Sequence, residues 1–330
     1  MQIEQGKILD VGEGYLSGGI DCKKYLLMPS FFNAHTHVGD SFAKEAALGL
    51  DVSHAVGEKS FKWELYEQSS PNERITAMKD TLAYMLASGT TGFADFREQG
   101  LEGVKELKSA LGKTEMKSVI LGRDINESEC DGFGLNLYQT NQIPNKRKKF
   151  LALHAGEKDG EIEKAFECKP DVLIHFTKAS NGEIKQAAVK KISVVVCPRS
   201  NSLLGVGLPK VREMIDAGLN VSLGTDNVML NQPDMLREME YLSKTSYLTG
   251  EPLTPTEVFR MATYNSASAF QINSGLLKEG MNADLLFVSK NAPNLKGSRN
   301  MLASVVHRCE PENIRKIMID GNFVLDKDKK

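Results

Sequence analysis

The sequence predicts an α/β protein: a (β/α)8 TIM barrel with a small β-sheet domain formed by the N- and C-terminal segments. Three observations lead to this prediction. From about residue 27 onward, short apolar segments alternate with amphipathic ones, which is typical of strands followed by helices. Several segments, such as ISVVVC and DVLIHF, are nearly continuous apolar runs, as expected for strands of a buried parallel sheet. The two ends of the chain are both strand-like.

Eight segments have the apolar character of barrel strands, and five segments between them have the pattern of helices. The expected strands are 26–33, 91–96, 117–121, 132–137, 150–154, 172–176, 192–197 and 221–225. The expected helices are 72–88, 101–111, 159–167, 181–190 and 209–217. The connection after the fourth strand is short and lysine-rich, so no helix is expected there. An open doubly wound sheet is the alternative, but no G-x-G-x-x-G motif follows the first strand.

The terminal segments differ from the barrel in character. Residues 1–27 are glycine-rich and strand-like, and the tail contains two strand candidates, ADLLFV and KIMIDGNFVL. We expect residues 1–27 and 281–330 to pair into one small β-domain, with residues 28–280 forming the catalytic barrel. The helix-like segment 254–270 opens with a threonine cap followed by proline and separates the barrel from the tail.

The composition limits the class of partner. The chain has 41% hydrophobic and 25% charged residues and a formal net charge of -2. These values are ordinary for a globular protein, and they favour neither nucleic acid nor a membrane as the partner. We find no N-terminal signal sequence and no apolar run of membrane-spanning length. The five cysteines are scattered without C-x-x-C spacing, so we expect a cytoplasmic location and no disulfides. The oligomeric state stays open, a homo-oligomer included.

Metal-binding residue types lie at the carboxyl ends of several predicted strands. The motif HTH follows the first strand, and in an extended chain His35 and His37 point the same way. His154 ends FLALH, His175 lies near the end of DVLIHF, and Asp226 follows VSLGT. A barrel of this kind places its active site at these strand ends. The imidazoles of the HTH pair and His154, with the Asp226 carboxylate, form a donor set suited to Zn²⁺, with Fe²⁺ as the alternative.

Two further residues could act on a metal-activated water. A divalent ion with an open position lowers the pKa of bound water from 15.7 to roughly 7. Glu157, three residues after His154, could carry protons between this water and a substrate. His175 could orient the hydroxide or donate a hydrogen bond to a developing oxyanion. The alternative is structural: strand-end histidines are often hydrogen-bonded core residues, Asp226 could cap a turn, and Glu157 could be a solvated loop acid.

The chain also resembles a known family, the amidohydrolase superfamily, and in particular its deaminase branch. That branch includes adenosine, cytosine, guanine and S-adenosylhomocysteine deaminases and is related to chlorohydrolases. The matching segments appear in the family's order and span most of the chain. They are MPSFFNAHTH, SGTTGFADF, LHAGE, VLIHFTK, VVVCPRSNSLLG, VSLGTDN and LTPTEVFRMATYNSASAFQI. The tail SGLLKEGMNADLLFVS is similar to the strand that closes the small β-domain in this family.

The resemblance implies one zinc ion per chain, held by His35, His37, His154 and Asp226. It further implies that Glu157 is the proton shuttle, that His175 assists the attacking water and that Asp226 accepts a proton. Binuclear branches bridge two metals through a carboxylated lysine or a glutamate on a middle strand, and the fourth strand candidate, GFGLNL, offers neither. The implied reaction is hydrolytic loss of ammonia from an amidine-like ring carbon of an aminated purine, nucleoside or related N-heterocycle.

Residues just past strand ends, and one aromatic residue in the long first loop, are candidates for substrate contact. They are Arg97, Glu98, Arg199, Asn201 and Trp63. The alternative for the four polar residues is rim salt bridges and turn hydrogen bonds, and for Trp63 it is packing beneath loop 40–70. Asn227 stands where adenosine deaminases usually carry a second acid, so the heterocycle stays open.

Three hypotheses follow. The leading one is a metal-dependent deaminase whose partner is a small heterocyclic substrate. The second is a hydrolase of the same scaffold that opens a cyclic amide or removes a halogen from a heteroaromatic ring. The third is a catalytically silent barrel that binds a ligand. The presence of a possible proton shuttle, Glu157, argues against this third hypothesis.

Overall fold

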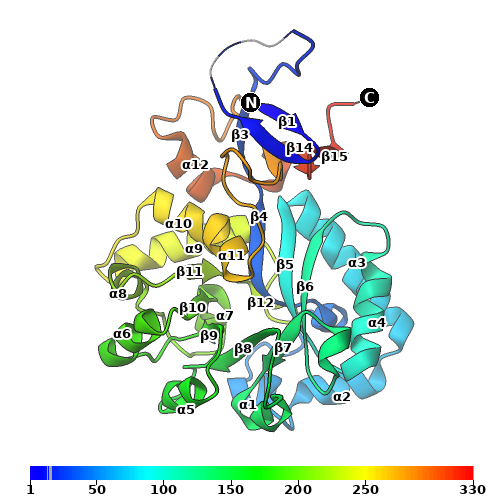
Figure 1. The fold of residues 1–330 in the computed structure, drawn as a ribbon, viewed down its shortest axis with the longest axis vertical. Helices are drawn as coiled ribbons and strands as arrows, with labels where there is room; N and C mark the ends of the chain where they lie inside the picture. Colours follow the sequence, from blue (N-terminus) through cyan, green and yellow to red (C-terminus); the bar gives the residue numbers. More distant parts are fainter. Residues whose placement is uncertain (13, 15–16, 330) are drawn as a thin grey trace.

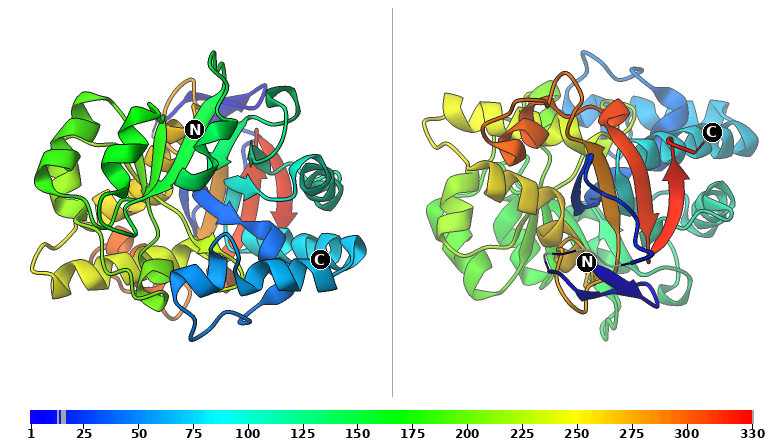
Figure 2. Two further views of the ribbon diagram at one scale, coloured as in Figure 1. Left: turned by 90° about the horizontal axis from the view of Figure 1, so that it is seen from below. Right: turned by 90° about the horizontal axis from the view of Figure 1, so that it is seen from above.

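The computed structural model describes residues 1–12, 14 and 17–329 and confirms the predicted barrel. A nine-stranded parallel sheet runs in the order β11-β10-β9-β8-β7-β6-β5-β4-β12. Because β11 and β12 follow each other in the chain and lie at the two edges of this order, they close the sheet into a ring (Figures 1 and 2). The strands are β4 (Phe31–His37), β5 (Thr90–Arg97), β6 (Lys117–Gly122), β7 (Gly132–Leu135), β8 (Phe150–Ala155), β9 (Val172–His175), β10 (Ser193–Val196), β11 (Val221–Leu223) and β12 (Asp226–Asn227).

The first predicted strand, 26–33, is two strands in the structure. β3 (Tyr25–Pro29) pairs antiparallel with β13 (Leu285–Ser289), whereas β4 belongs to the barrel. The break falls at Ser30, whose N–H donates to the Asp284 carbonyl oxygen at 3.0 Å. The prediction of one strand was wrong here because an unbroken apolar run does not reveal that the chain passes from one sheet to another.

A small antiparallel sheet joins the two ends of the chain, as predicted. Its order is β15-β14-β13-β3, with β14 at Ile314–Ile319 and β15 at Asn322–Asp326. β1 (Gln2–Glu4) and β2 (Lys7–Asp10) form a separate hairpin. Both termini and this sheet lie at the top of Figure 1, above the barrel. The expected boundaries at residues 27 and 281 stay a prediction, because strand pairing does not define where independent domains separate.

Helices surround the barrel, and five of them lie on the predicted helical segments. The helices that follow the first loop are α3 (Pro71–Ala87), α4 (Gly100–Leu111), α5 (Glu161–Glu167), α6 (Asn181–Val189), α7 (Pro198–Leu203), α8 (Val211–Asp216), α9 (Met235–Leu248), α10 (Pro255–Ala262), α11 (Tyr264–Ala269) and α12 (Met301–Arg308). Capping boxes at Ser180 and Thr254 fix the starts of α6 and α10. Only a 3₁₀ turn, Leu137–Gln142, follows β7, as its lysine-rich connection predicts.

The long first loop covers the carboxyl ends of the strands. It contains a 3₁₀ turn (Val38–Ala43), α1 (Val52–Val56) and α2 (Phe61–Gln68), which lie at the end of the barrel opposite the small sheet (Figure 1). Apolar side chains of the loop pack with side chains that follow β10 and β12. The cluster consists of Ala43, Ala47, Ala55, Leu204, Val206, Met229 and Leu230. Among the described residues, no helix has the length and apolar character that crossing a bilayer requires.

Candidate metal centre

Ligand atoms from four barrel strands converge at this covered end. One group, whose ligand atoms all lie within 4.8 Å of one another, consists of His35, His154, His175 and Asp226. His35 Nε2 lies 3.1 Å from Asp226 Oδ1 and 3.3 Å from His154 Nε2. His37 Nε2 lies 3.6 Å from the same aspartate oxygen. Three of the four predicted metal ligands, His35, His154 and Asp226, thus belong to this group, whose fourth member is His175. His37, the fourth predicted ligand, lies beside the group, and its place as a ligand stays a prediction.

Strand pairing explains why distant segments meet. Asp226 pairs with Thr36, between the two histidines of the HTH motif, and His175 pairs with Ala155, next to His154. The backbone is left-handed at two of the converging residues, with φ of 62° at Asp226 and 73° at His175. Such conformations cost about 1–3 kcal/mol each for non-glycine residues and cluster at functional sites. The barrel thus maintains a locally unfavourable backbone where the ligand atoms meet.

Burial keeps the donor groups in their metal-binding forms. It lowers the pKa of His35 to about 3 and lowers the pKa of His154 well below its usual value, so both imidazoles are neutral at pH 7. Burial alone would raise the pKa of Asp226, but the hydrogen bond with His35 and the nearby imidazoles hold this pKa well below its usual value. Neutral imidazoles and a carboxylate are the donors that a divalent cation binds. These residues therefore fit a metal ion.

Neighbouring polar groups orient the ligands. Ser200 Oγ donates to Asp226 Oδ2 at 2.5 Å, while Asp226 Oδ1 faces the imidazoles. Glu98 Oε1 lies 2.8 Å from His37 Nδ1 and accepts a hydrogen bond from Lys62 Nζ at 2.7 Å. A histidine that donates its Nδ1–H to a carboxylate presents the Nε2 lone pair to a metal. Glu98, predicted as a substrate contact, is hydrogen-bonded to His37, a predicted metal ligand.

The described residues contain a second group of metal-binding types, but a side chain already fills it. This group consists of His37, Asp40 and Glu98. The Lys62 ammonium lies 2.7 Å from a carboxylate oxygen of each acid. An ammonium therefore already neutralises these two carboxylates. The number of metal ions per chain stays a prediction.

Glu157 and His175 lie beside the metal-binding group. His175 Nδ1 lies 2.9 Å from Asn201 Oδ1, and the Asn201 amide donates to Thr177 Oγ1 at 2.8 Å. Because this amide is oriented by Thr177, His175 donates its Nδ1–H to Asn201 and keeps a lone pair on Nε2. That nitrogen lies 3.8 Å from Glu157 Oε1. Burial raises the pKa of Glu157, which favours a carboxyl that holds and releases a proton.

Three successive backbone N–H groups fix the position of Glu157. The N–H groups of Gly156, Glu157 and Lys158 all donate to Glu161 Oε2, at 2.9, 3.0 and 3.1 Å. Gly156 has φ of 93°, and a Cβ there would lie 2.8 Å from the Phe176 Cα, so only glycine fits this turn. The carboxyl of Glu161 therefore holds the turn that carries Glu157.

A cavity of about 400 Å³ opens onto these groups. It is lined by His37, Val56, Lys62, Arg123, Asn136, His154, Glu157, His175, Leu204, Asp226, Asn227 and Leu230. The first loop contributes Val56 and Lys62, so the loop forms part of the binding surface. Besides the predicted metal and proton-transfer residues, this cavity contains groups that sequence reasoning missed, above all Lys62, Arg123 and Asn136.

The five predicted substrate contacts do not line this cavity. Trp63 donates its indole N–H to the Gly57 carbonyl oxygen at 3.1 Å. Arg199 lies 3.5 Å from the Glu238 carboxylate, and Asn201 binds His175. Glu98 binds His37, and Arg97 is 2% exposed. These residues position other groups in the structure, and their contact with a substrate stays a prediction.

The Arg97 side chain packs against the 3₁₀ turn of the first loop, and a substitution in that turn can test this packing. Its guanidinium donates to Tyr66 Oη at 3.2 Å and to Glu98 Oε2 at 3.0 Å. A Cβ on Gly39 would lie 1.6 Å from Arg97 Nη2. We expect Gly39→Ala to lower the free energy of unfolding by about 1–3 kcal/mol, measured by denaturant titration. Gly182→Ala in α6, where the nearest atom lies 3.9 Å from the new Cβ, is the control and should not destabilise. Equal effects of the two substitutions would contradict this account of Gly39.

Glu238 is a fully buried acid whose charge should depend on pH. Its Oε1 accepts the Arg199 backbone N–H at 3.0 Å, and burial raises its pKa to about 7. A raised pKa in the folded state means that stability is lost as pH rises through 7, because folding then buries a charge. We expect Glu238→Gln to gain stability over the wild type between pH 5 and 9, by up to about 3 kcal/mol. Thermal unfolding across pH measures this, with Glu240→Gln as the control; a gain independent of pH would contradict it.

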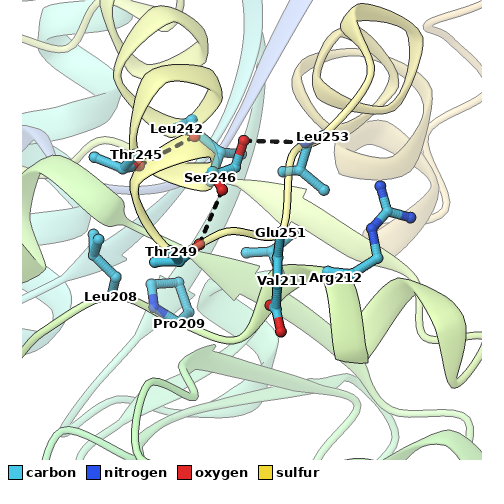
Figure 3. A pocket seen from close by; sticks show the side chains of 10 residues that line it. All are labelled: Leu208, Pro209, Val211, Arg212, Leu242, Thr245, Ser246, Thr249, Glu251 and Leu253. Atoms are coloured by element: carbon cyan, nitrogen blue, oxygen red, sulfur yellow. Dashed lines mark hydrogen bonds between the residues drawn. The ribbon is translucent and has the colours of Figure 1, made fainter.

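A second hollow, of about 290 Å³, lies beside α8 and α9 (Figure 3). Its hydrogen-bonding groups pair with each other: the Leu253 N–H donates to Ser246 Oγ at 3.0 Å, and Thr249 Oγ1 donates to the Ser246 carbonyl oxygen at 3.0 Å. Arg212 at its edge is paired with Glu257 at 2.8 Å. Neither metal-binding group of the described residues lies here, so the chemistry belongs to the cavity at the strand ends.

The sequence of this chain is similar to that of known proteins. A family model described as the amidohydrolase family matches residues 136–324. This chain belongs to the amidohydrolase family. The amidohydrolase is 30% identical to a 5-methylthioadenosine/S-adenosylhomocysteine deaminase of Pelotomaculum thermopropionicum, over 98% of this chain and 88% of that protein. It is 26% identical to a 5'-deoxyadenosine deaminase of Methanococcoides burtonii, over 99% and 87% of the two chains.

A solved structure shows the same fold at lower sequence identity. The atrazine chlorohydrolase of Arthrobacter aurescens TC1, complexed with zinc, superposes with a TM-score of 0.80 at 16% identity, covering 99% of this amidohydrolase and 90% of that chain. The predicted family and fold are thus confirmed, and the amidohydrolase carries a metal site at the strand ends of its barrel.

Proposed function

We propose that this amidohydrolase is a zinc-dependent deaminase that releases ammonia from an aminated purine or purine nucleoside. One observation carries the proposal: His37, His154, His175 and Asp226 line one cavity with Glu157, whose partly buried carboxyl group lies 3.8 Å from His175. Similarity to two nucleoside deaminases over nearly the whole chain supports this choice of substrate class.

Zinc suits the spacing of the donor atoms. Ligand atoms around a tetrahedral zinc ion with bonds of about 2.0–2.1 Å are roughly 3.3 Å apart. Three of the separations lie near that value: His35 to Asp226 at 3.1 Å, His35 to His154 at 3.3 Å, and His37 to Asp226 at 3.6 Å. Fe²⁺ accepts the same donors, so elemental analysis of the purified protein decides between the two metals.

Glu157, Asp226 and His175 each have a separate role in the proposed reaction. An ion held by these donors would lower the pKa of a water molecule to roughly 7 and so supply hydroxide at neutral pH. Glu157, with its raised pKa, protonates the ring nitrogen next to the amino-bearing carbon. The Asp226 carboxylate accepts the proton of the attacking water, and the His175 Nε2 lone pair accepts a hydrogen bond that orients it. The Asp226 carboxyl then passes its proton to the amino nitrogen, the carbon–nitrogen bond breaks, and ammonia leaves as a ring carbonyl forms, so that one water is consumed.

An ammonia-release screen tests the proposal. Zinc-loaded protein is incubated with 5'-deoxyadenosine, 5-methylthioadenosine, S-adenosylhomocysteine, adenine, guanine and cytosine, and ammonia is measured with a coupled assay. We expect release from at least one purine compound. Chloride release from a chlorotriazine without any ammonia release would favour the halogen-removing alternative. Binding of these compounds without turnover would favour the silent ligand-binding barrel.

A further inference from the structure

Lys62 is a buried cation that the first loop inserts among the strand ends. It lies on α2, is 3% exposed and lines the metal cavity. Its ammonium lies 2.7 Å from Asp40 Oδ2 and 2.7 Å from Glu98 Oε1. Burial alone would lower the pKa of Lys62, but these two carboxylates raise it above its usual value. The side chain is therefore charged at neutral pH and joins two acids from different parts of the barrel.

Each of these acids is also bonded to a residue beside the metal-binding group. Glu98 follows β5, and its Oε1 lies 2.8 Å from His37 Nδ1. Asp40 follows β4, and its Oδ2 accepts a hydrogen bond from the Asn227 side-chain amide at 2.6 Å. His37 and Asn227 are paired residues of β4 and β12, and Asn227 is the chain neighbour of Asp226. The ammonium is therefore connected, through one carboxylate on each side, to both members of this pair.

These connections exist only while α2 is docked over the strand ends. Tyr66 lies four residues after Lys62, on the same face of the helix, and its hydroxyl donates to Asp40 Oδ1 at 2.8 Å. The two side chains attach α2 to the barrel. Of the two, the Lys62 ammonium is the group that reaches the carboxylate beside His37. The position of the loop and the orientation of a predicted metal ligand thus depend on the same side chain.

Loss of the ammonium would leave two buried carboxylates facing the same point. Like charges at close range in a buried site repel each other strongly. Glu98 would keep the Arg97 guanidinium at Oε2, at 3.0 Å, but the nearest cation to Oε1 would then be Arg123, at 3.6 Å. The repulsion is relieved when Asp40 or Glu98 rotates away. Rotation of Glu98 removes the acceptor that orients His37, and such acceptors contribute to metal affinity.

We propose that Lys62 is a positioning residue that couples docking of the first loop to metal binding. While α2 is docked, the ammonium holds the carboxylates that orient His37 and Asn227, and when the loop opens the metal centre loses this support. The inference rests on the metal centre of the proposed function, not on the deaminase reaction itself. Coupling is reciprocal, so a bound ion should stabilise the docked loop by the factor by which docking strengthens metal binding.

The first test uses the wild-type protein and needs no substitution. Hydrogen exchange of the α2 amides, followed by mass spectrometry, is compared with and without saturating zinc. We expect zinc to slow this exchange by about 5- to 150-fold, the usual range of coupling between two sites. Exchange in α12, which lies near the small sheet (Figure 1), is the reference and should change less. Exchange in α2 that is unaffected by zinc would overturn the inference, whatever the variants show.

The second test removes the ammonium. Lys62→Met should raise the Kd for zinc by about 10- to 100-fold, measured by competition with a chelator, and should abolish the zinc-dependent protection of α2. Adding propylammonium to Lys62→Ala returns a cation to the vacated space and should recover part of the zinc affinity, whereas propanol should not. Lys59→Met, at an exposed lysine just before α2, is the control and should leave both readouts unchanged.

Two results with the variant would also overturn the inference. One is zinc affinity in Lys62→Met that equals or exceeds that of the wild type, because loss of a nearby positive charge would then outweigh any loss of orientation. The other is weaker affinity with the zinc-dependent protection of α2 retained, which indicates a structural role. These readouts are independent of turnover. Coupling without ammonia release would refute the deaminase function alone, and ammonia release without coupling would refute this inference alone.

Discussion

Glu157→Gln is expected to reduce kcat by about 100- to 10,000-fold while the protein keeps its metal ion. Glutamine has nearly the same shape as glutamate but cannot donate a carboxyl proton to a ring nitrogen. Glu157 lies outside the group of converging donors, so the substitution removes no metal ligand. Steady-state ammonia release and elemental analysis of the same preparation measure the two quantities together.

A neighbouring acid provides the control for Glu157. Glu163 is exposed on α5, and Glu163→Gln should leave both turnover and metal content unchanged. If Glu157→Gln turned over substrate at the wild-type rate, Glu157 would not be the proton shuttle, and the proposed division of proton transfers would be wrong.

Asp226→Asn is expected to abolish turnover by removing the ion itself. The substitution replaces the one anionic donor of the group by a neutral amide, which leaves only neutral imidazoles around a doubly charged ion. Loss of a residue that merely hydrogen-bonds a ligand costs about 10- to 100-fold in metal affinity, so loss of the carboxylate should cost more. Metal affinity measured by competition with a chelator, together with ammonia release, checks both effects.

Two further variants make the result for Asp226 specific. Ser200→Ala removes the hydroxyl that donates to Asp226 Oδ2 and should give the smaller loss of affinity expected for an orienting residue. Asp216→Asn, at an exposed position on α8, should change nothing. Full metal content in Asp226→Asn would show that the imidazoles alone bind the ion and would contradict the assignment of Asp226 as a ligand.

The metal donors could be predicted from sequence because their signal is local. Each of His154, His175 and Asp226 ends an apolar run, and the topology of a parallel barrel brings such ends together without knowledge of packing. Arg123 follows the third strand candidate in the same way. The strand-end rule therefore applies to this arginine as well, although an arginine is not a metal-binding residue type.

Other features depend on contacts between distant segments and were not predictable. Lys62 reaches the cavity only because α2 docks over the strand ends, and nothing in its neighbouring sequence indicates that docking. Arg97 and Glu98 also follow a strand end, yet they turn toward Tyr66 and His37. The direction of a side chain past a strand end is decided by the elements packed against it, which a strand-end rule does not include.

The division of one apolar segment into β3 and β4 has a consequence for how the protein is made. β3 ends at Pro29, and its pairing strand β13 begins at Leu285. A nascent chain leaving the ribosome therefore carries an unpaired apolar strand through almost the whole of its synthesis. The barrel can begin to assemble in that time, but β3 stays unpaired until the ribosome has synthesised β13. Polypeptides released before β13 is made would keep the edge of β3 exposed. Chaperones and proteases would therefore recognise such incomplete chains.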